Sequence, residues 1–264
     1  MAEGPKLHLD IETYSEAPLK KCGVDVYAAH PSTELLCASY AFGDGPVHCW
    51  IPHDIFDIPD EVYDGLREKM DFHGEIHATR EVPDDLRAHI EAGGIVSAHN
   101  ARFERTVLNG TAGKRLNFPT LKLSQMVCTM AKVAAHSLPQ ALGQAASALG
   151  TYAKNEQFKP WMLAVSKPRN PTKDNPDTRW TPQNDGERFV GLYDYCNDDV
   201  KAERAIDKRI PDLSPFEQQV WMLDQKINDR GMLGDLENVD HALKLIDEYK
   251  RLLEIRCIEI CGIK

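Results

Sequence analysis

An alternation of apolar and polar residues near the N-terminus constrains the fold more than any other stretch. The apolar members are Leu7, Leu9 and Ile11. This two-residue period is typical of a β-strand with one face in a core, and it places Asp10 and Glu12 together on the other face. Two carboxylates so close raise each other's pKa unless a cation neutralises them, so the pair indicates a metal site. A solvated strand face often carries the same pair, so this segment leaves both interpretations open.

A second group of signals follows the Gly93-Gly94 pair. Residues 95–98 have the composition of a short buried strand, and Asn100 is well placed to cap a following helix. Glu104 then stands in the first turn of that helix, where the helix dipole favours a negative charge. An ordinary capped helix would look the same.

The third segment, residues 187–206, contains no proline, and its apolar residues suit one long helix. Tyr195 and Asp199 are four residues apart, so they lie on the same face of that helix. Asp198 points elsewhere, and we expect it to be solvated.

Taken in order, the three segments resemble the motifs of DEDD-type 3′-to-5′ exonucleases with the tyrosine variant of the last motif. The resemblance is to the proofreading domain of bacteriophage family A DNA polymerases, and it covers most of the chain. Supporting stretches are residues 23–34, 98–105 and 213–231. Most of the wider superfamily has Asp where this chain has Glu104, and the longer side chain resembles the phage branch.

The resemblance implies a two-metal site. Asp10, Glu12 and Asp199 would hold one ion, which lowers the pKa of the attacking water. Tyr195 would orient that water. Asp10 would bridge to a second ion that stabilises the departing 3′ oxygen, and Glu104 would reach this ion directly or through water.

The expected ions are two Mg²⁺, with Mn²⁺ able to substitute, because the ligands are hard oxygens. The substrate would be the 3′ end of single-stranded DNA, and the product a nucleoside monophosphate. Thr13, Asn100 and Phe103 flank the acids and are candidates for contact with the terminal nucleotide, although Phe103 could equally belong to the core.

The fold expected from the resemblance is α/β, a ribonuclease H-like mixed sheet flanked by helices, with a C-terminal helical extension. Strands are expected at residues 6–12, 35–42, 47–51 and 95–98, with a hairpin connection at 43–46. Helices are expected over 60–92 with a polar interruption, over 124–149 with a break at 137–139, and over 187–208. Residues 157–184 hold five prolines with Trp161 and Trp180. These tryptophans would either stack on a substrate base or anchor a long loop to its own domain.

We predict an exonuclease domain at residues 1–212 and a helical segment at 213–264 that resembles the start of a polymerase thumb. Two helices are expected there, at 215–230 and 235–262, with a break at Gly231. The second carries an apolar stripe made of Leu243, Ile246, Tyr249, Leu253 and Ile260. Little else in the chain can cover this stripe, so we hypothesise a fragment or subunit that joins a DNA polymerase.

The formal charge of −10 is unusual for a nucleic-acid protein. A nuclease that grips a few terminal nucleotides through metals depends less on basic surface. The seven cysteines form no CxxC pair, so the sequence predicts neither a disulfide framework nor a zinc site. This cysteine usage fits a cytoplasmic location best. His73 and His77 share helical spacing, but the intervening Gly74 argues against a metal site. No apolar run has the length of a membrane span.

Two other functions are compatible with the sequence. A 3′-to-5′ exoribonuclease of the same superfamily would share the carboxylates. A non-catalytic module that binds DNA or a replisome partner would have no chemical need for all four acids.

Overall fold

The computed structural model describes residues 4–53, 57–69, 74–173 and 176–262. The chain forms two compact units, residues 1–225 and 226–264, so the first part of helix α10 (Pro215–Arg230) belongs to the first unit. Each unit is described by itself.

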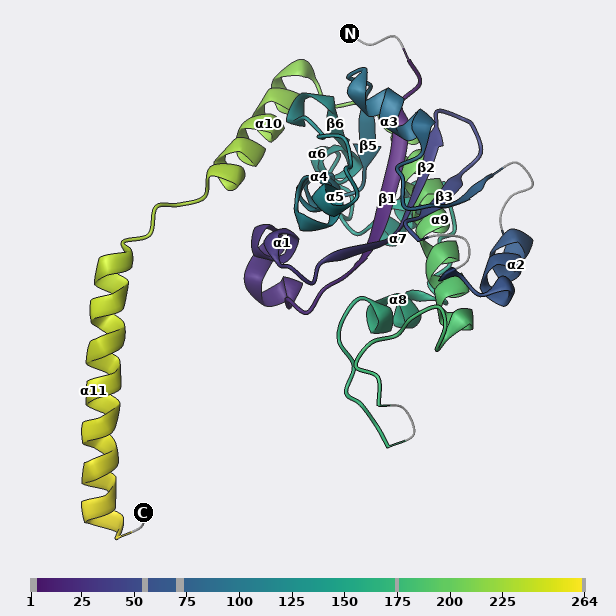
Figure 1. Ribbon diagram of the computed structural model, residues 1–264. Coiled ribbons are helices and arrows are strands. Elements are labelled where there is room, and N and C mark those ends of the chain that lie inside the picture. The colour runs from purple at the N-terminus through teal and green to yellow at the C-terminus, as the bar shows by residue number, and fades with distance from the viewer. Residues whose placement is uncertain (1–3, 54–56, 70–73, 174–175, 263–264) are drawn as a thin grey trace. The chain divides into compact units, whose positions relative to one another are not determined.

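A six-stranded mixed sheet forms the centre of the first unit, in the order β4-β3-β2-β1-β5-β6 (Figure 1). Its strands are β1 (Leu7–Tyr14), β2 (Glu34–Phe42), β3 (His48–Ile51), β4 (Ile76–Ala78), β5 (Val96–Ala98) and β6 (Met126–Cys128). The first three strands are antiparallel neighbours, while β4, β5 and β6 each pair in parallel with the adjacent strand. This is the expected α/β architecture, a ribonuclease H-like mixed sheet with flanking helices and a C-terminal helical extension.

Helices pack on both faces of the sheet. One face is covered by α1 (Leu19–Ala29), α3 (Asp84–Glu91), α4 (Arg102–Asn109) and α5 (Thr111–Arg115). The other face is covered by α2 (Asp60–Lys69), α8 (Lys159–Val165) and α9 (Gly186–Arg209). Near the end of α9 a smaller cluster adds α6 (Thr129–Ala135) and α7 (Leu142–Leu149).

Strand β1 behaves as its alternation predicts. Leu7, Leu9 and Ile11 are buried in the core on the α1, α3 and α4 side. Asp10 and Glu12 therefore face α9, which crosses the opposite side of the sheet. The pairing of β1 with β2 shifts register between Glu12 and Thr13, and such a bulge changes the direction of the side chains that follow.

Helix α9 is the long helix that the sequence predicts. The Asp185 side chain caps it by accepting a hydrogen bond from the Arg188 amide at 3.2 Å. Ser39 of β2 donates to the Asn197 side-chain oxygen at 2.6 Å and ties the middle of the helix to the sheet. The helix is thus positioned to hold Tyr195 and Asp199 beside β1.

Several expectations were wrong in detail. The segment 60–92 contains strand β4 between α2 and α3, and the segment 124–149 contains strand β6 before α6. Each strand has three residues, too few for a visible alternation, and each depends on a parallel neighbour for its hydrogen bonds. Helix α8 forms inside the segment 157–184, where a loop was expected.

Asn100 does not cap helix α4 as predicted. It adopts a left-handed conformation with φ of 71°, and Ala101 occupies the cap position. Asn tolerates this conformation better than most residues, so Asn100 turns the chain between β5 and α4.

Helix α10 begins with a reciprocal cap in which Ser214 and Glu217 each accept from the other's amide. Gly231 ends the helix with φ of 69°, as predicted. The second unit consists mainly of α11 (Leu236–Cys261), capped by Asp235. The residues of its apolar stripe are exposed. Of the helices that the structure describes, none has the length and apolar character to cross a membrane.

Candidate active site

Three carboxylates from two distant parts of the chain converge beside β1. One oxygen from each of Asp10, Glu12 and Asp199 lies within 4.8 Å of the others. The strand supplies two of them because its period places residues 10 and 12 on one face, and α9 supplies the third. Glu12 and Asp199 are each 8% exposed, so the group is shielded from bulk water.

Burial and mutual repulsion dominate the electrostatics of this group. Burial raises the pKa of Asp10 well above its usual value, and the charge of Asp199 raises it further. Burial also raises the pKa of Glu12, with the charge of Asp10 as the next cause. Burial raises the pKa of Asp199 to about 6, although the nearby Lys154 opposes this shift. The arrangement is therefore costly for anions unless a cation is present.

Glu104 extends the acidic group from the first turn of α4. Its side chain is buried, and among the described residues its Oε2 has no hydrogen-bond partner. Burial raises its pKa well above the usual value, and the charge of Asp10 is the next cause. A buried carboxylate oxygen without a partner is an expensive group that a cation or an ordered water would satisfy.

Tyr195 lies one helical turn before Asp199 and is buried. Its hydroxyl accepts a hydrogen bond from the Lys154 ammonium at 2.7 Å. Burial raises the pKa of Tyr195, and the charge of Asp199 raises it further, so the phenol keeps its proton at neutral pH. The same Lys154 Nζ lies 2.5 Å from Asp199 Oδ1 and 4.0 Å from the centre of the Tyr195 ring.

No pattern in the sequence pointed to Lys154 or to the role of Asp198, which helps to place it. Asp198 was expected to be solvated, but it accepts hydrogen bonds from the Tyr152 hydroxyl and, at 2.8 Å, from the Asn155 amide. These bonds fasten the loop on either side of Lys154 to α9. Adjacent acids thus have different tasks, since Asp198 anchors the loop and Asp199 pairs with its lysine.

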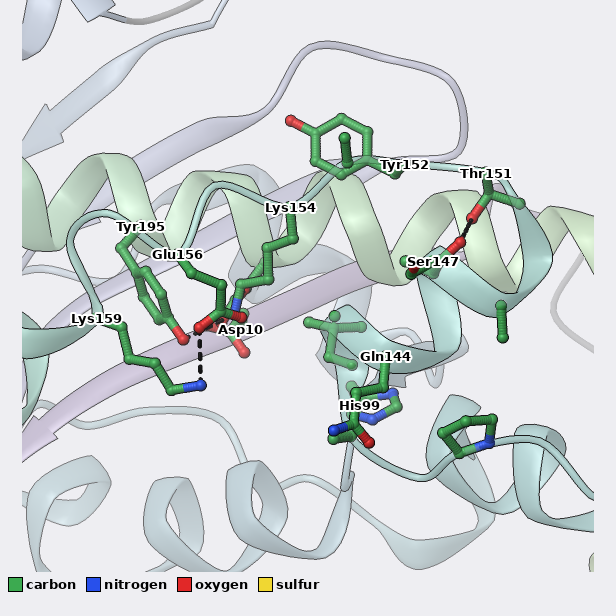
Figure 2. A pocket seen from close by; sticks show the side chains of 18 of the residues that line it. Asp10, His99, Gln144, Ser147, Thr151, Tyr152, Lys154, Glu156, Lys159 and Tyr195 are labelled. Atoms are coloured by element: carbon green, nitrogen blue, oxygen red, sulfur yellow. Dashed lines mark hydrogen bonds and ion pairs between the residues drawn. The ribbon is translucent and has the colours of Figure 1, made fainter.

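A cleft of about 1320 Å³ opens beside these groups (Figure 2). Asp10, Tyr195 and Lys154 lie at one end, together with Glu156 and Lys159, whose ion pair measures 2.7 Å. Towards the other end lie His99, Gln144, Ser147 and Thr151. The cleft has room for several nucleotide-sized groups next to the carboxylates.

His99 lines the cleft with both of its ring nitrogens engaged. Its Nε2 donates to the Gln140 carbonyl at 2.7 Å, and its Nδ1 lies 3.1 Å from the Thr129 hydroxyl. Burial lowers its pKa. Because both ring nitrogens are engaged, the ring tethers the segment before α7 to the start of α6.

Behind the carboxylates, a buried network joins three elements. His8 Nδ1 of β1 lies 2.6 Å from Glu203 of α9, and Ser97 of β5 donates to the other oxygen of Glu203 at 2.6 Å. This network fixes the spacing between the helix that carries Asp199 and the strand that carries Asp10.

The three predicted nucleotide contacts lie in different environments. The Thr13 side chain is buried, and its hydroxyl lies 2.8 Å from that of Tyr27. Phe103 packs against the core with its ring 6.1 Å from that of Tyr27. Asn100 is exposed. Their contact with substrate stays a prediction.

Trp161 and Trp180 anchor their segment to the domain, which is the second of the two interpretations left open. Arg188 of α9 stacks on both rings, at 5.8 Å and 4.5 Å from their centres. Trp161 also packs against Gly191 so closely that an added Cβ there would lie 2.5 Å from the ring.

Comparison with known proteins gives one informative similarity. The sequence matches no family model. It is 33% identical over 261 residues to a protein named DNA polymerase from Bacillus phage SP02. That alignment covers 97% of this chain but 36% of the relative, so the chain spans about a third of the length of the curated protein it matches. The chain is therefore homologous to one part of a phage protein that bears this name.

The residues at the site fit divalent cations bound through oxygen. Buried carboxylates with raised pKa values converge there, and within the described part of the chain Glu104 Oε2 has no hydrogen-bond partner. The Lys154 ammonium supplies a positive charge beside Asp199. Hard carboxylate ligands without a thiolate or imidazole in the set favour Mg²⁺ or Mn²⁺.

Proposed function

We propose that this chain is a metal-dependent 3′-to-5′ exonuclease that hydrolyses the terminal phosphodiester of DNA and proofreads for a DNA polymerase. The observation that carries the proposal is the convergence of Asp10, Glu12 and Asp199 at the end of a cleft. Homology to a phage protein named DNA polymerase supports the polymerase context.

In this proposal Asp10, Glu12, Glu104 and Asp199 would hold two Mg²⁺ ions. Two such ions supply a lowered pKa for the attacking water and charge stabilisation for the leaving 3′ oxygen. The remaining work falls to the chain's own groups. The protonated Tyr195 hydroxyl would orient the attacking water by a hydrogen bond, because Tyr195 and Asp199 lie on the same face of α9.

Lys154 has two positions in this proposal. Without metal, its ammonium compensates the charge of Asp199. With divalent cations bound to the carboxylates, the ammonium would be released from Asp199 and would be placed to contact a phosphate oxygen of the terminal nucleotide, since the loop that carries it lines the cleft. The anchors from Asp198 keep the loop in place while the side chain moves.

The substrate proposed is a single-stranded DNA 3′ end. The chain carries a formal charge of −10, so the affinity of its surface for a phosphate backbone is low. A DNA polymerase domain or subunit would supply the basic surface that binds the duplex, and the cleft would receive the frayed strand. Thr13, Asn100 and Phe103 stay candidates for contact with the last nucleotide.

The test is hydrolysis of matched DNA and RNA single strands labelled at the 5′ end, with Mg²⁺ or with EDTA. We expect a ladder of products shortened from the 3′ end on DNA, and no ladder with EDTA. Faster RNA degradation would favour an exoribonuclease. Binding of DNA without hydrolysis under any divalent cation would contradict the enzymatic proposal.

A further inference from the structure

A second group of metal-ligating side chains lies on the other face of the sheet, near its β4 edge. Strands β3 and β4 pair in parallel with Cys49 opposite Ile76 and Trp50 opposite His77. The Cys49 amide also donates to the Glu75 carbonyl at 2.9 Å, which extends the register by one residue. Because side chains alternate along each strand, His48, Glu75 and His77 share one face.

The ligand atoms of these three residues lie within 4.8 Å of one another. His77 Nε2 is 3.6 Å from Glu75 Oε2, which is close to the separation of about 3.3 Å between two ligands of a tetrahedral zinc ion. Glu75 is exposed and free to adjust its rotamer, whereas both imidazoles are partly buried. A small movement of one flexible carboxylate would complete a three-ligand set.

The strongest sign of a ligand is an unsatisfied atom. His77 Nε2 is inaccessible to solvent, and within the described part of the chain it has no hydrogen-bond partner. A buried ring nitrogen without a partner is unfavourable, and an ion or an ordered water is its usual explanation. The nitrogen faces Glu75 rather than the core, so the missing partner belongs between these side chains.

The surroundings hold both imidazoles in place. The Tyr40 ring stacks on His48 at 5.2 Å and on His77 at 6.1 Å, and its hydroxyl donates to Asp85 at 3.0 Å. Burial lowers the pKa of His48, and the neighbouring His77 lowers it further, so its ring is neutral at physiological pH. Neutral, oriented imidazoles are the form that binds metal.

We propose that His48, Glu75 and His77 bind one zinc-class transition-metal ion that fastens the three-residue strand β4 to β3. A two-imidazole, one-carboxylate set is typical of Zn²⁺ and related ions, with a fourth position for water. One long hydrogen bond, from the Glu75 amide to His48 Nδ1 at 3.3 Å, must break when the ion binds. Either Nδ1 holds the ion, or Nε2 holds it and Nδ1 carries the proton. This site is independent of the proposed nuclease centre, which lies across the sheet and offers oxygen ligands alone.

Titration with Zn²⁺, followed by calorimetry and by thermal unfolding, tests the proposal, and Co²⁺ absorption reports the ligand geometry. The background carries Asp10→Asn, Cys257→Ser and Cys261→Ser, because the acidic cleft and the two exposed thiols of α11 could bind these ions. We expect one ion per chain and, with Zn²⁺ at about 100 times its Kd, a Tm increase of about 5–10 °C. We also expect a four- or five-coordinate Co²⁺ spectrum.

His48→Ala or His77→Ala should lower Zn²⁺ affinity at least about 100-fold and remove the Tm increase. Glu75→Gln provides a second probe at an exposed position, should a histidine variant fail to fold. His241→Ala, on α11, is the matched control and should behave as the background does. Equal Zn²⁺ affinity in the background, the two histidine variants and Glu75→Gln would overturn the proposal.

Discussion

The two faces of one sheet present contrasting sets of metal-ligating residues. On the α9 face, carboxylates from β1 and α9 converge although they are almost 190 positions apart in sequence. On the opposite face, His48, Glu75 and His77 come from two neighbouring strands and include two imidazoles. The first set matches hard cations and the second matches zinc-class ions, so the ligand chemistry separates their proposed tasks.

The comparison also shows how each set is kept together without metal. Lys154 compensates the acidic set, and the His8, Glu203 and Ser97 network holds its supporting elements at fixed spacing. Tyr40 and strand pairing hold the histidine set. Charge compensation thus dominates on one face and ring stacking on the other.

The largest expected effect separates the two sets by function. Asp10→Ala or Asp199→Ala should reduce Mg²⁺-dependent hydrolysis of a labelled DNA strand by about 1,000-fold or more, because several kcal/mol of transition-state stabilisation are lost. His77→Ala is the control from the other face and should retain hydrolysis within about twofold. A large loss in His77→Ala with intact folding would show that the two faces are coupled.

The next effect concerns pH and stability without metal. Asp199 has a folded-state pKa of about 6, above its ordinary value of 3.8, so the folded protein binds more protons than the unfolded chain in that window. The stability that protonated Asp199 contributes is therefore complete below pH 4 and is lost as pH rises through about 6. This loss in the free energy of unfolding is on the order of 3 kcal/mol. Urea unfolding in EDTA at pH 4 to 7 measures this. Asp199→Asn should remove only the part of this fall that Asp199 contributes, because Asp10, Glu12 and Glu104 also have raised pKa values. A pH curve parallel to that of the wild type would contradict the assignment.

A somewhat smaller effect is expected from Lys154→Met. Without metal at pH 7, it should lower the free energy of unfolding by about 2 kcal/mol, less than the ~3–5 kcal/mol for a broken buried pair, because the acids can take up protons. Saturating Mg²⁺ should reduce the difference in the free energy of unfolding between this variant and the wild type, since the cations would replace the charge of the ammonium. Lys159→Met is the matched control, because its pair with Glu156 is largely exposed. A loss that Mg²⁺ leaves unchanged would assign Lys154 to packing alone.

The smallest effect is expected from Tyr195→Phe. The change removes one oriented hydroxyl and leaves the carboxylates, so hydrolysis should slow about tenfold while Mg²⁺ affinity stays close to that of the wild type. Single-turnover rates at saturating Mg²⁺ measure the chemical step. Wild-type rates in this variant would exclude the water-orienting role.

Strong local periods predicted the elements that carry the proposed nuclease site. The alternation in β1 and the uninterrupted pattern of α9 are long enough to be read without tertiary information, and both elements formed where expected. Strands β4 and β6 were missed because three residues show no period and gain their hydrogen bonds from distant partners. The histidine set was missed with them, since His77 was compared with His73, which lies outside the described residues.

The sequence by itself determined which side chains share a face of β1 and of α9, because backbone periodicity is a local property. Only the tertiary structure decided that Asp198 anchors a loop while Asp199 joins the acidic set, and that Lys154 of that loop reaches Asp199. The same holds for His48, Glu75 and His77, which a strand pairing brings together. Which groups meet across a fold depends on strand order and packing, and these are set by the burial of the whole core rather than by any single segment.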